Sequence, residues 1–141
     1  MVLAVNFSAC KEETKVEYPI EISFTEYSLA STFCQWTNLN YDDKLIVINS
    51  DKELKSYISC SDGNYPEIDF SKHTLLLANG ITPNGIVEIS SHLLQPSVNE
   101  YKLEIEILLN DADVNEPWTT ALIMNKLSKE NDIELIIILI R

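Results

Sequence analysis

The most suggestive spacing for chemistry lies in an acidic stretch of the second half of the chain. Asp111, Asp113 and Asn115 follow the pattern D-x-D-x-N, with which a calcium-binding loop begins to present its oxygen ligands. Such a loop also needs a glycine at its sixth position and a glutamate at its twelfth. The chain has Glu116 and Leu122 at those positions. We therefore favour a polar loop over a metal site, and we expect no cofactor.

Neither histidine is accompanied by the partners that catalysis requires. His73 stands at the start of one predicted strand and His92 at the end of another, and each could act as a general base in principle. The chain contains neither a Gly-x-Ser-x-Gly nucleophile elbow nor a glycine-rich loop that cradles phosphate. We predict that the protein is not an enzyme.

Cys10 ends a short apolar run and is followed by Lys11-Glu12-Glu13. The sequence Phe7-Ser8-Ala9-Cys10 resembles the lipobox of bacterial lipoproteins, in which the signal peptide is cut before a cysteine that then carries lipid. The resemblance implies a protein anchored in the bacterial outer membrane, on its periplasmic or cell-surface side. The basic segment that opens a signal peptide is missing, so we expect Met1 to lie downstream of the true start. The alternative is an ordinary first strand with Cys10 buried.

If Cys10 carries lipid, Cys34 and Cys60 remain as a pair. In an oxidising compartment an even number of cysteines suggests a disulfide. The bridge would close a loop of about 27 residues and stabilise the fold by roughly 3.5 kcal/mol in the chain-entropy treatment. The alternative is two buried free thiols.

Composition limits the partners and the domain count. The 141 residues carry a formal net charge of −12, and Arg141 is the only arginine. Nucleic-acid binding needs clustered basic residues, so we exclude it. No apolar run reaches the roughly 20 residues of a membrane-spanning helix, so the lipid is the expected membrane contact. The length suits a signal and tether over residues 1–15 and one domain over residues 16–141.

Apolar patterns predict a mainly β domain. Residues 16–24 and 101–109 alternate with the period of two that is typical of half-buried strands. The continuous apolar runs at 74–78 and 133–140 predict strands buried on both faces. Further strands are expected at 33–36, 44–49, 86–93 and 118–124. This pattern predicts an antiparallel β-sandwich or open barrel of about seven to eight strands.

Two local signals complete the predicted fold. Ser50-Asp-Lys-Glu53 has the pattern of a capping box and predicts one short helix over residues 51–58. Asn84-Gly85, which tolerates positive φ, predicts a hairpin between the strands on either side of it.

From Ile48 onward the chain resembles the C-terminal domain of the PrcB family, a subunit of a bacterial protease complex. The resemblance covers about two-thirds of the chain, and the residues that carry it are Ile48–Leu54, Pro66–Lys72, Leu75–Leu77, Gly80, Asn84-Gly85 and Ala121–Ile138. The family tends to place a second glycine and an aromatic after the position of Gly85, where this chain has Ile86 and Val87. The resemblance implies a small non-enzymatic accessory domain and supplies no catalytic residue.

These observations together predict an exported protein-interaction module whose partner is a protein such as a protease. Turns and exposed aromatic residues mark interfaces, so the candidate contacts are Gly80, Ile81, Thr82, Pro83, Asn84, Gly85 and Trp118. Trp118 could instead pack inside. The alternative function is binding of a small ligand or glycan in a cleft lined by Tyr27, Trp36, Tyr41 and Tyr65.

Overall fold

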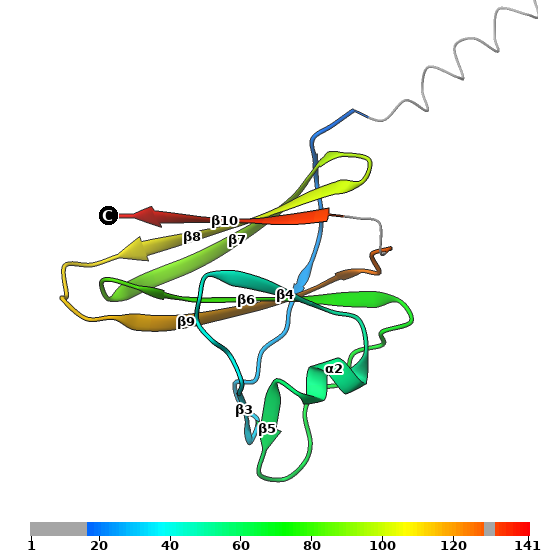
Figure 1. Ribbon diagram of the computed structural model, residues 1–141, viewed down its shortest axis with the longest axis horizontal. Helices are drawn as coiled ribbons and strands as arrows, with labels where there is room; N and C mark the ends of the chain where they lie inside the picture. Colours follow the sequence, from blue (N-terminus) through cyan, green and yellow to red (C-terminus); the bar gives the residue numbers. More distant parts are fainter. Residues whose placement is uncertain (1–16, 129–131) are drawn as a thin grey trace, which may run out of the picture.

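The computed structural model describes residues 17–128 and 132–141. The predicted lipidation site Cys10, with the predicted signal and tether, lies outside the described residues. The rest of the chain is mainly β, with two four-stranded sheets and a separate two-stranded ribbon (Figure 1). This confirms the predicted β-sandwich class.

The two large sheets differ in what covers them. We call one the outer sheet, in the order β1 (Ile20–Glu21), β7 (Ile86–Ser97), β8 (Glu100–Leu109) and β10 (Asp132–Ile140). The inner sheet has the order β2 (Thr25–Glu26), β9 (Glu116–Asn125), β6 (His73–Thr82) and β4 (Lys44–Ile48). Neighbouring strands are antiparallel except β8 and β10, which run parallel.

The main core fills the space between the sheets. Odd-numbered residues of β8 from Leu103 to Leu109 are buried and even-numbered ones are partly exposed, so the alternation predicted there is confirmed. The buried residues of this core are Leu76, Ala78, Leu93, Leu103, Ile105, Ile107, Leu109, Trp118, Leu122, Met124 and Leu127. Both sheets contribute, as the hydrophobic effect requires of two stacked apolar faces.

A second core covers the other face of the inner sheet. Leu75 and Leu77 of β6 pack there against Tyr27, Leu29 and Leu54. Because Leu76 of the same strand enters the main core, β6 is buried on both faces. The prediction of a central strand at residues 74–78 is therefore confirmed.

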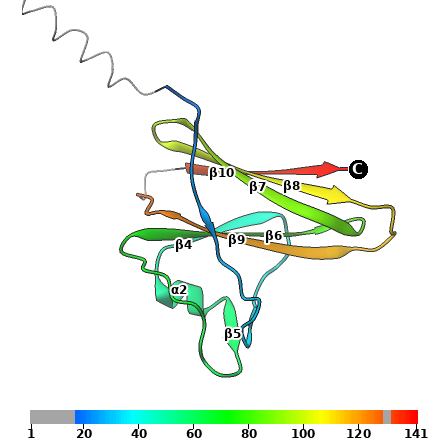
Figure 2. The same cartoon turned by 180° about the vertical axis from the view of Figure 1, so that it is seen from behind.

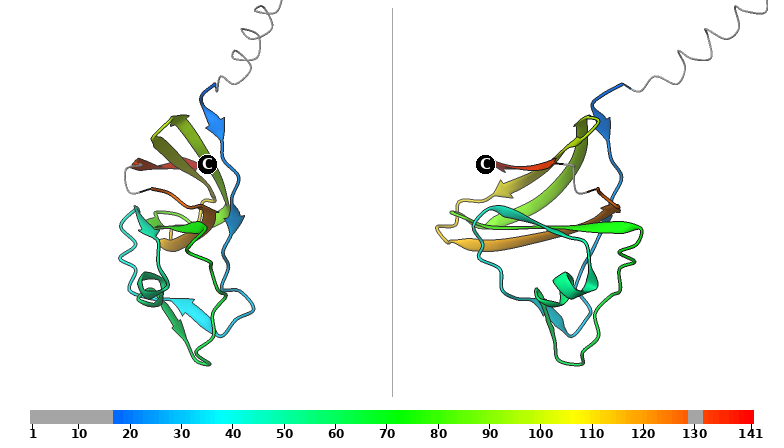
Figure 3. Two further views of the ribbon diagram at one scale, coloured as in Figure 1. Left: turned by 90° about the vertical axis from the view of Figure 1, so that its right-hand side faces the viewer. Right: turned by 45° about the vertical axis from the view of Figure 1, so that its right-hand side comes forward.

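The helix and the ribbon lie on the far side of the inner sheet from the outer sheet (Figures 2 and 3). Helix α2 (Asp51–Lys55) begins where Ser50 Oγ accepts a hydrogen bond from Glu53 N at 3.2 Å, and Glu53 Oε1 accepts one from Asn49 N at 3.1 Å. The predicted capping residues are thus confirmed. The helix is shorter than the predicted 51–58, because Ile58 instead begins strand β5 (Ile58–Cys60), opposite Trp36.

A disulfide joins Cys34 and Cys60. The two residues lie directly opposite each other in the ribbon formed by β3 (Cys34–Trp36) and β5. Only three residue pairs connect these strands, and a two-stranded ribbon is marginal by itself. The disulfide therefore fixes a part of the fold that has little hydrogen bonding of its own.

Three details of the predicted topology are wrong. The strand predicted over residues 16–24 is replaced by the two-residue strands β1 and β2, which pair with β7 in one sheet and β9 in the other. The described residues contain ten strands rather than seven or eight, and these short strands account for part of the excess. Asn84-Gly85 does not close a hairpin, because β6 and β7 belong to different sheets; the turn crosses between them.

The last strand also differs from its prediction. Residues 133–140 were expected to be buried on both faces, but β10 is at the edge of the outer sheet and pairs with β8 alone. Its inward residues Ile133, Leu135 and Ile137 pack against the main core. Ile138 and Ile140, which point to the opposite face, are exposed. No helix in the described part of the chain has the length and apolarity that a bilayer-spanning helix needs.

Candidate interaction surface

The turn from β6 to β7 and the loop from β8 to β9 lie together at one end of the sandwich, at the left of Figure 1. We call this region the turn end and define it as residues 80–87 and 110–117. It includes most of the contacts predicted from the sequence. It also includes the stretch with calcium-like spacing.

Hydrogen bonds hold the two loops of the turn end against each other. Gly85 O accepts from Asn110 N at 2.9 Å, and Gly85 N donates to Ala112 O at 3.3 Å. The side-chain amide of Asn84 donates to Ala112 O at 3.0 Å. Ile86 N donates to Glu116 Oε1 at 3.1 Å. The backbone of the turn end is therefore fixed before any partner arrives.

Three apolar side chains project from this fixed backbone. Ile81, Val87 and Val114 are 47%, 58% and 50% exposed. They come from β6, β7 and the β8–β9 loop, so they are distant in sequence but belong to one end of the fold. Exposed apolar residues on a rigid surface are a common feature of protein interfaces. Of the three, only Ile81 was among the contacts predicted from the sequence.

The other predicted contacts divide between surface and interior. Pro83 is exposed and Asn84 half-buried, whereas Gly80, Thr82 and Gly85 are buried. Thr82 stabilises the turn, because its hydroxyl donates a hydrogen bond to Asn84 O at 2.7 Å. Buried members of the set shape the turn, and the exposed ones are available to a partner.

Trp118 lies inside the main core and is 3% exposed. The packing alternative that the sequence left open is therefore the one observed. Its ring offers no exposed aromatic surface at the turn end.

The acidic stretch lies at the surface of the turn end. Asp111, Asp113 and Asn115 are exposed. The carboxylate of Glu116 accepts a hydrogen bond from the Ile86 amide. Among residues 17–128 and 132–141, no group of three or more His, Cys, Asp or Glu side chains is placed to hold a metal ion. The two histidines do not meet, because His73 belongs to the inner sheet and His92 to the outer sheet. His92 Nε2 lies 3.8 Å from Glu106 Oε2.

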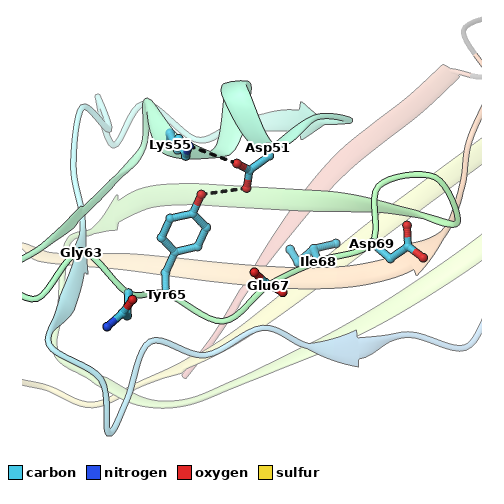
Figure 4. A pocket seen from close by; sticks show the side chains of 8 residues that line it. Asp51, Lys55, Gly63, Tyr65, Glu67, Ile68 and Asp69 are labelled. Carbon is cyan, nitrogen blue, oxygen red and sulfur yellow. Dashed lines mark hydrogen bonds and ion pairs between the residues drawn. The ribbon is translucent and has the colours of Figure 1, made fainter.

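An open cleft of about 640 Å³ lies beside α2 and contains the most closely placed titratable groups in the described structure (Figure 4). Tyr65 donates its hydroxyl hydrogen to Asp51 Oδ1 at 2.7 Å, and Lys55 Nζ lies 3.4 Å from Asp51 Oδ2. Desolvation, then the hydrogen bond to Asp51 and the nearby carboxylates, raise the pKa of Tyr65 to about 12. Tyr65 is therefore protonated at neutral pH and donates its hydroxyl hydrogen to Asp51.

The aromatic residues proposed for a ligand cleft mostly take part in packing. The rings of Tyr27 and Trp36 have centroids 5.9 Å apart, and both residues belong to the second core together with Tyr65. The Tyr27 hydroxyl donates to Pro66 O at 2.7 Å. Tyr41 lies elsewhere, where its backbone amide donates to Asn79 Oδ1 at 2.8 Å. A cleft of about 260 Å³ is lined in part by Tyr27 and Trp36.

Comparison with protein-family models, with curated proteins and with solved structures found no match to this chain. The geometry of the described residues is therefore the main support for a functional conclusion.

Proposed function

We propose that this chain is an exported, lipid-anchored interaction domain that binds a protein partner and performs no chemistry itself. Lipid on Cys10 holds the domain at the outer membrane. Its partner class, by the resemblance to the PrcB domain, is a protease or a protease complex. The turn end is the surface through which the partner is bound.

The observation that carries this proposal is the exposure of Ile81, Val87 and Val114 over a hydrogen-bonded backbone. Burial of apolar surface in a complex is favourable by about 25 cal/mol for each Å² removed from water. This free energy is not gained while the three side chains stay exposed to solvent. A partner that covers them recovers this energy without ordering a loop first, because the loops are already fixed. The two histidines lie in different sheets and therefore do not form a common site. This placement supports the proposal that the domain performs no chemistry.

Quantitative co-purification from detergent-solubilised envelopes tests the proposal. The double variant Ile81→Lys/Val114→Lys places two charges at the turn end and should reduce partner recovery by about tenfold or more, which corresponds to at least about 1.4 kcal/mol. The matched control is Val98→Lys, because Val98 is 65% exposed in the β7–β8 turn. Equal recovery by the double variant and the control contradicts the proposal.

Glycan or small-ligand binding is the second candidate. The cleft beside Tyr27 and Trp36 favours it, since sugar-binding sites use aromatic faces in a concave pocket. Tyr27 is nevertheless buried against the second core, which leaves less aromatic surface for a sugar. Unchanged tryptophan fluorescence in the presence of millimolar mono- and oligosaccharides would contradict this candidate.

A further inference from the structure

The two sheets have four edge strands, and three of these are short. β1 and β2 contain two residues each. β4 contains five and carries the exposed Lys44. Short length and edge lysines are the usual ways in which proteins keep another strand from adding to a sheet.

β10 has neither form of protection. It is nine residues long, and it has no charged residue or proline between Glu134 and Arg141. Its last three residues, Ile138, Leu139 and Ile140, are 38%, 45% and 39% exposed. Within the described residues no strand pairs with its outer edge. Its hydrogen-bonding groups on that side are therefore available for a further strand.

The side chains around this edge define two different environments for a strand that adds to it. On the core side, a cleft of about 340 Å³ between β10 and the β4 edge is lined by the apolar residues Leu45, Val47, Leu127 and Ile133 and by the polar residues Asn49, Ser128 and Asp132. The four apolar residues offer contacts to apolar side chains of an added strand. It lies at the open margin of the sandwich, because β4 and β10 end their respective sheets.

On the solvent side, carboxylates lie next to the apolar edge. Ile136 and Ile138 of β10 lie opposite Glu104 and Glu106 of β8 in the sheet register. A strand added to β10 would be about 4.8 Å from it and about 10 Å from β8. Lysine and arginine side chains on the added strand can span that distance and reach the carboxylates.

We propose that the outer edge of β10 accepts an extended segment of a partner protein in which apolar residues alternate with lysine or arginine. The apolar residues enter the cleft beside Leu45 and Val47, and the basic residues pair with Glu104 and Glu106. The inference rests on the interaction function proposed above and names the form and charge of the partner. A second copy of this chain is disfavoured as the occupant, because each copy carries a net charge of −12 and like charges oppose association.

Synthetic peptides of about ten residues, the length of an ordinary long strand, test the proposal with the full chain. The probe alternates lysine and valine, and its comparator alternates glutamate and valine. Two further versions of the lysine peptide are N-methylated on alternate residues, one on the odd set and the other on the even set. In strand addition only alternate amides face the acceptor edge, so one methylated version should lose binding and the other should keep it.

The protein variant is Ile138→Lys, with Val98→Lys as its matched control, since both residues are exposed. Ile138→Lys should weaken binding of the lysine–valine peptide by about tenfold or more, and the control by less than about twofold. Equal denaturation midpoints of the two variants show that folding is preserved. Three results would each overturn the proposal. The lysine and glutamate peptides bind equally, both methylated versions keep binding, or Ile138→Lys has no effect on peptide binding. A dimer of the free chain that Ile138→Lys abolishes overturns it as well, because the occupant is then a second copy.

The two proposals fail in different ways. If partner recovery depends on Ile81 and Val114 but does not change in Ile138→Lys, only the strand-addition proposal is contradicted. Peptide binding at β10 without any recovered partner contradicts the proposed interaction function alone.

Discussion

Gly80 of β6 lies directly opposite Trp118 of β9 in the inner sheet, and the indole occupies the space beside it. A Cβ atom at position 80 would be 2.8 Å from Trp118 Nε1, and it would also meet the carboxylate of Asp43. Trp118 Nε1 has no hydrogen-bond partner among the described residues. The absence of a side chain at position 80 thus makes room for the largest residue of the main core beneath the turn end.

Gly80→Ala should therefore destabilise the protein. Overpacking a well-filled core costs about 1–3 kcal/mol, and the free energy of unfolding from urea titration measures it. The same change in an Asp43→Ala background separates the two contacts, because the carboxylate is then gone and the indole stays. An unchanged unfolding midpoint for Gly80→Ala would mean that Trp118 moves aside freely.

The disulfide should account for a large part of the stability of the ribbon. Replacing both Cys34 and Cys60 by serine should lower the free energy of unfolding by about 3.5 kcal/mol, because the loop between them is no longer closed in the unfolded chain. Urea titration of the oxidised protein against the double variant gives the difference. A loss below about 0.5 kcal/mol would show that the bridge adds little to the packing of β3 and β5.

The structure also predicts a loss of stability at high pH. Burial, then the charges of Tyr65 and Asp51, raise the pKa of Tyr27 from 10.0 to about 12. The folded state therefore favours the neutral phenol, whose hydroxyl donates to Pro66 O. The stabilisation is complete below pH 10 and is lost as the pH rises through about 12. Absorbance titration of tyrosinate should show a component near pH 12 that shrinks in Tyr27→Phe; titration of every tyrosine near its ordinary pKa would contradict this.

The proposed lipid anchor on Cys10 gives a separate prediction. Mass spectrometry of the protein from its native membrane should find Cys10 as the first residue, with lipid on its sulfur. The same spectrum should show Cys34 and Cys60 joined. A mature protein that retains residues 1–9, with Cys10 as a free thiol, would contradict the anchor while leaving the interaction surface unaffected.

Local patterns predicted the parts of the fold that depend on local chemistry. The alternation along residues 101–109 defines β8, because one side of the strand faces the core and the other faces water. The Ser50–Glu53 pair marks the start of α2, because its hydrogen bonds form within one turn. Counting suggested the Cys34–Cys60 pair on the assumption of lipid on Cys10, but it left two free thiols as the alternative, and the structure shows the bridge.

The errors concern which strands meet. An apolar run such as residues 133–140 has the same appearance in a central strand and in an exposed edge strand, so the sequence did not reveal the open edge of β10. Asn84-Gly85 favours a tight turn, but it does not decide whether the flanking strands pair or enter different sheets. Val87 and Val114 were missed for the same reason. They belong to the same end of the fold only because the β6–β7 turn bonds to the β8–β9 loop.

Site-specific photo-crosslinking in intact cells is the most direct test of the claim that the turn end binds a protein. A photoreactive amino acid replaces Val114 in one strain and Val98 in another, and crosslinked species are identified by mass spectrometry. We predict one reproducible protein partner crosslinked from position 114 and not from position 98. Absence of a crosslinked protein at position 114, or the same products from both positions, would contradict it.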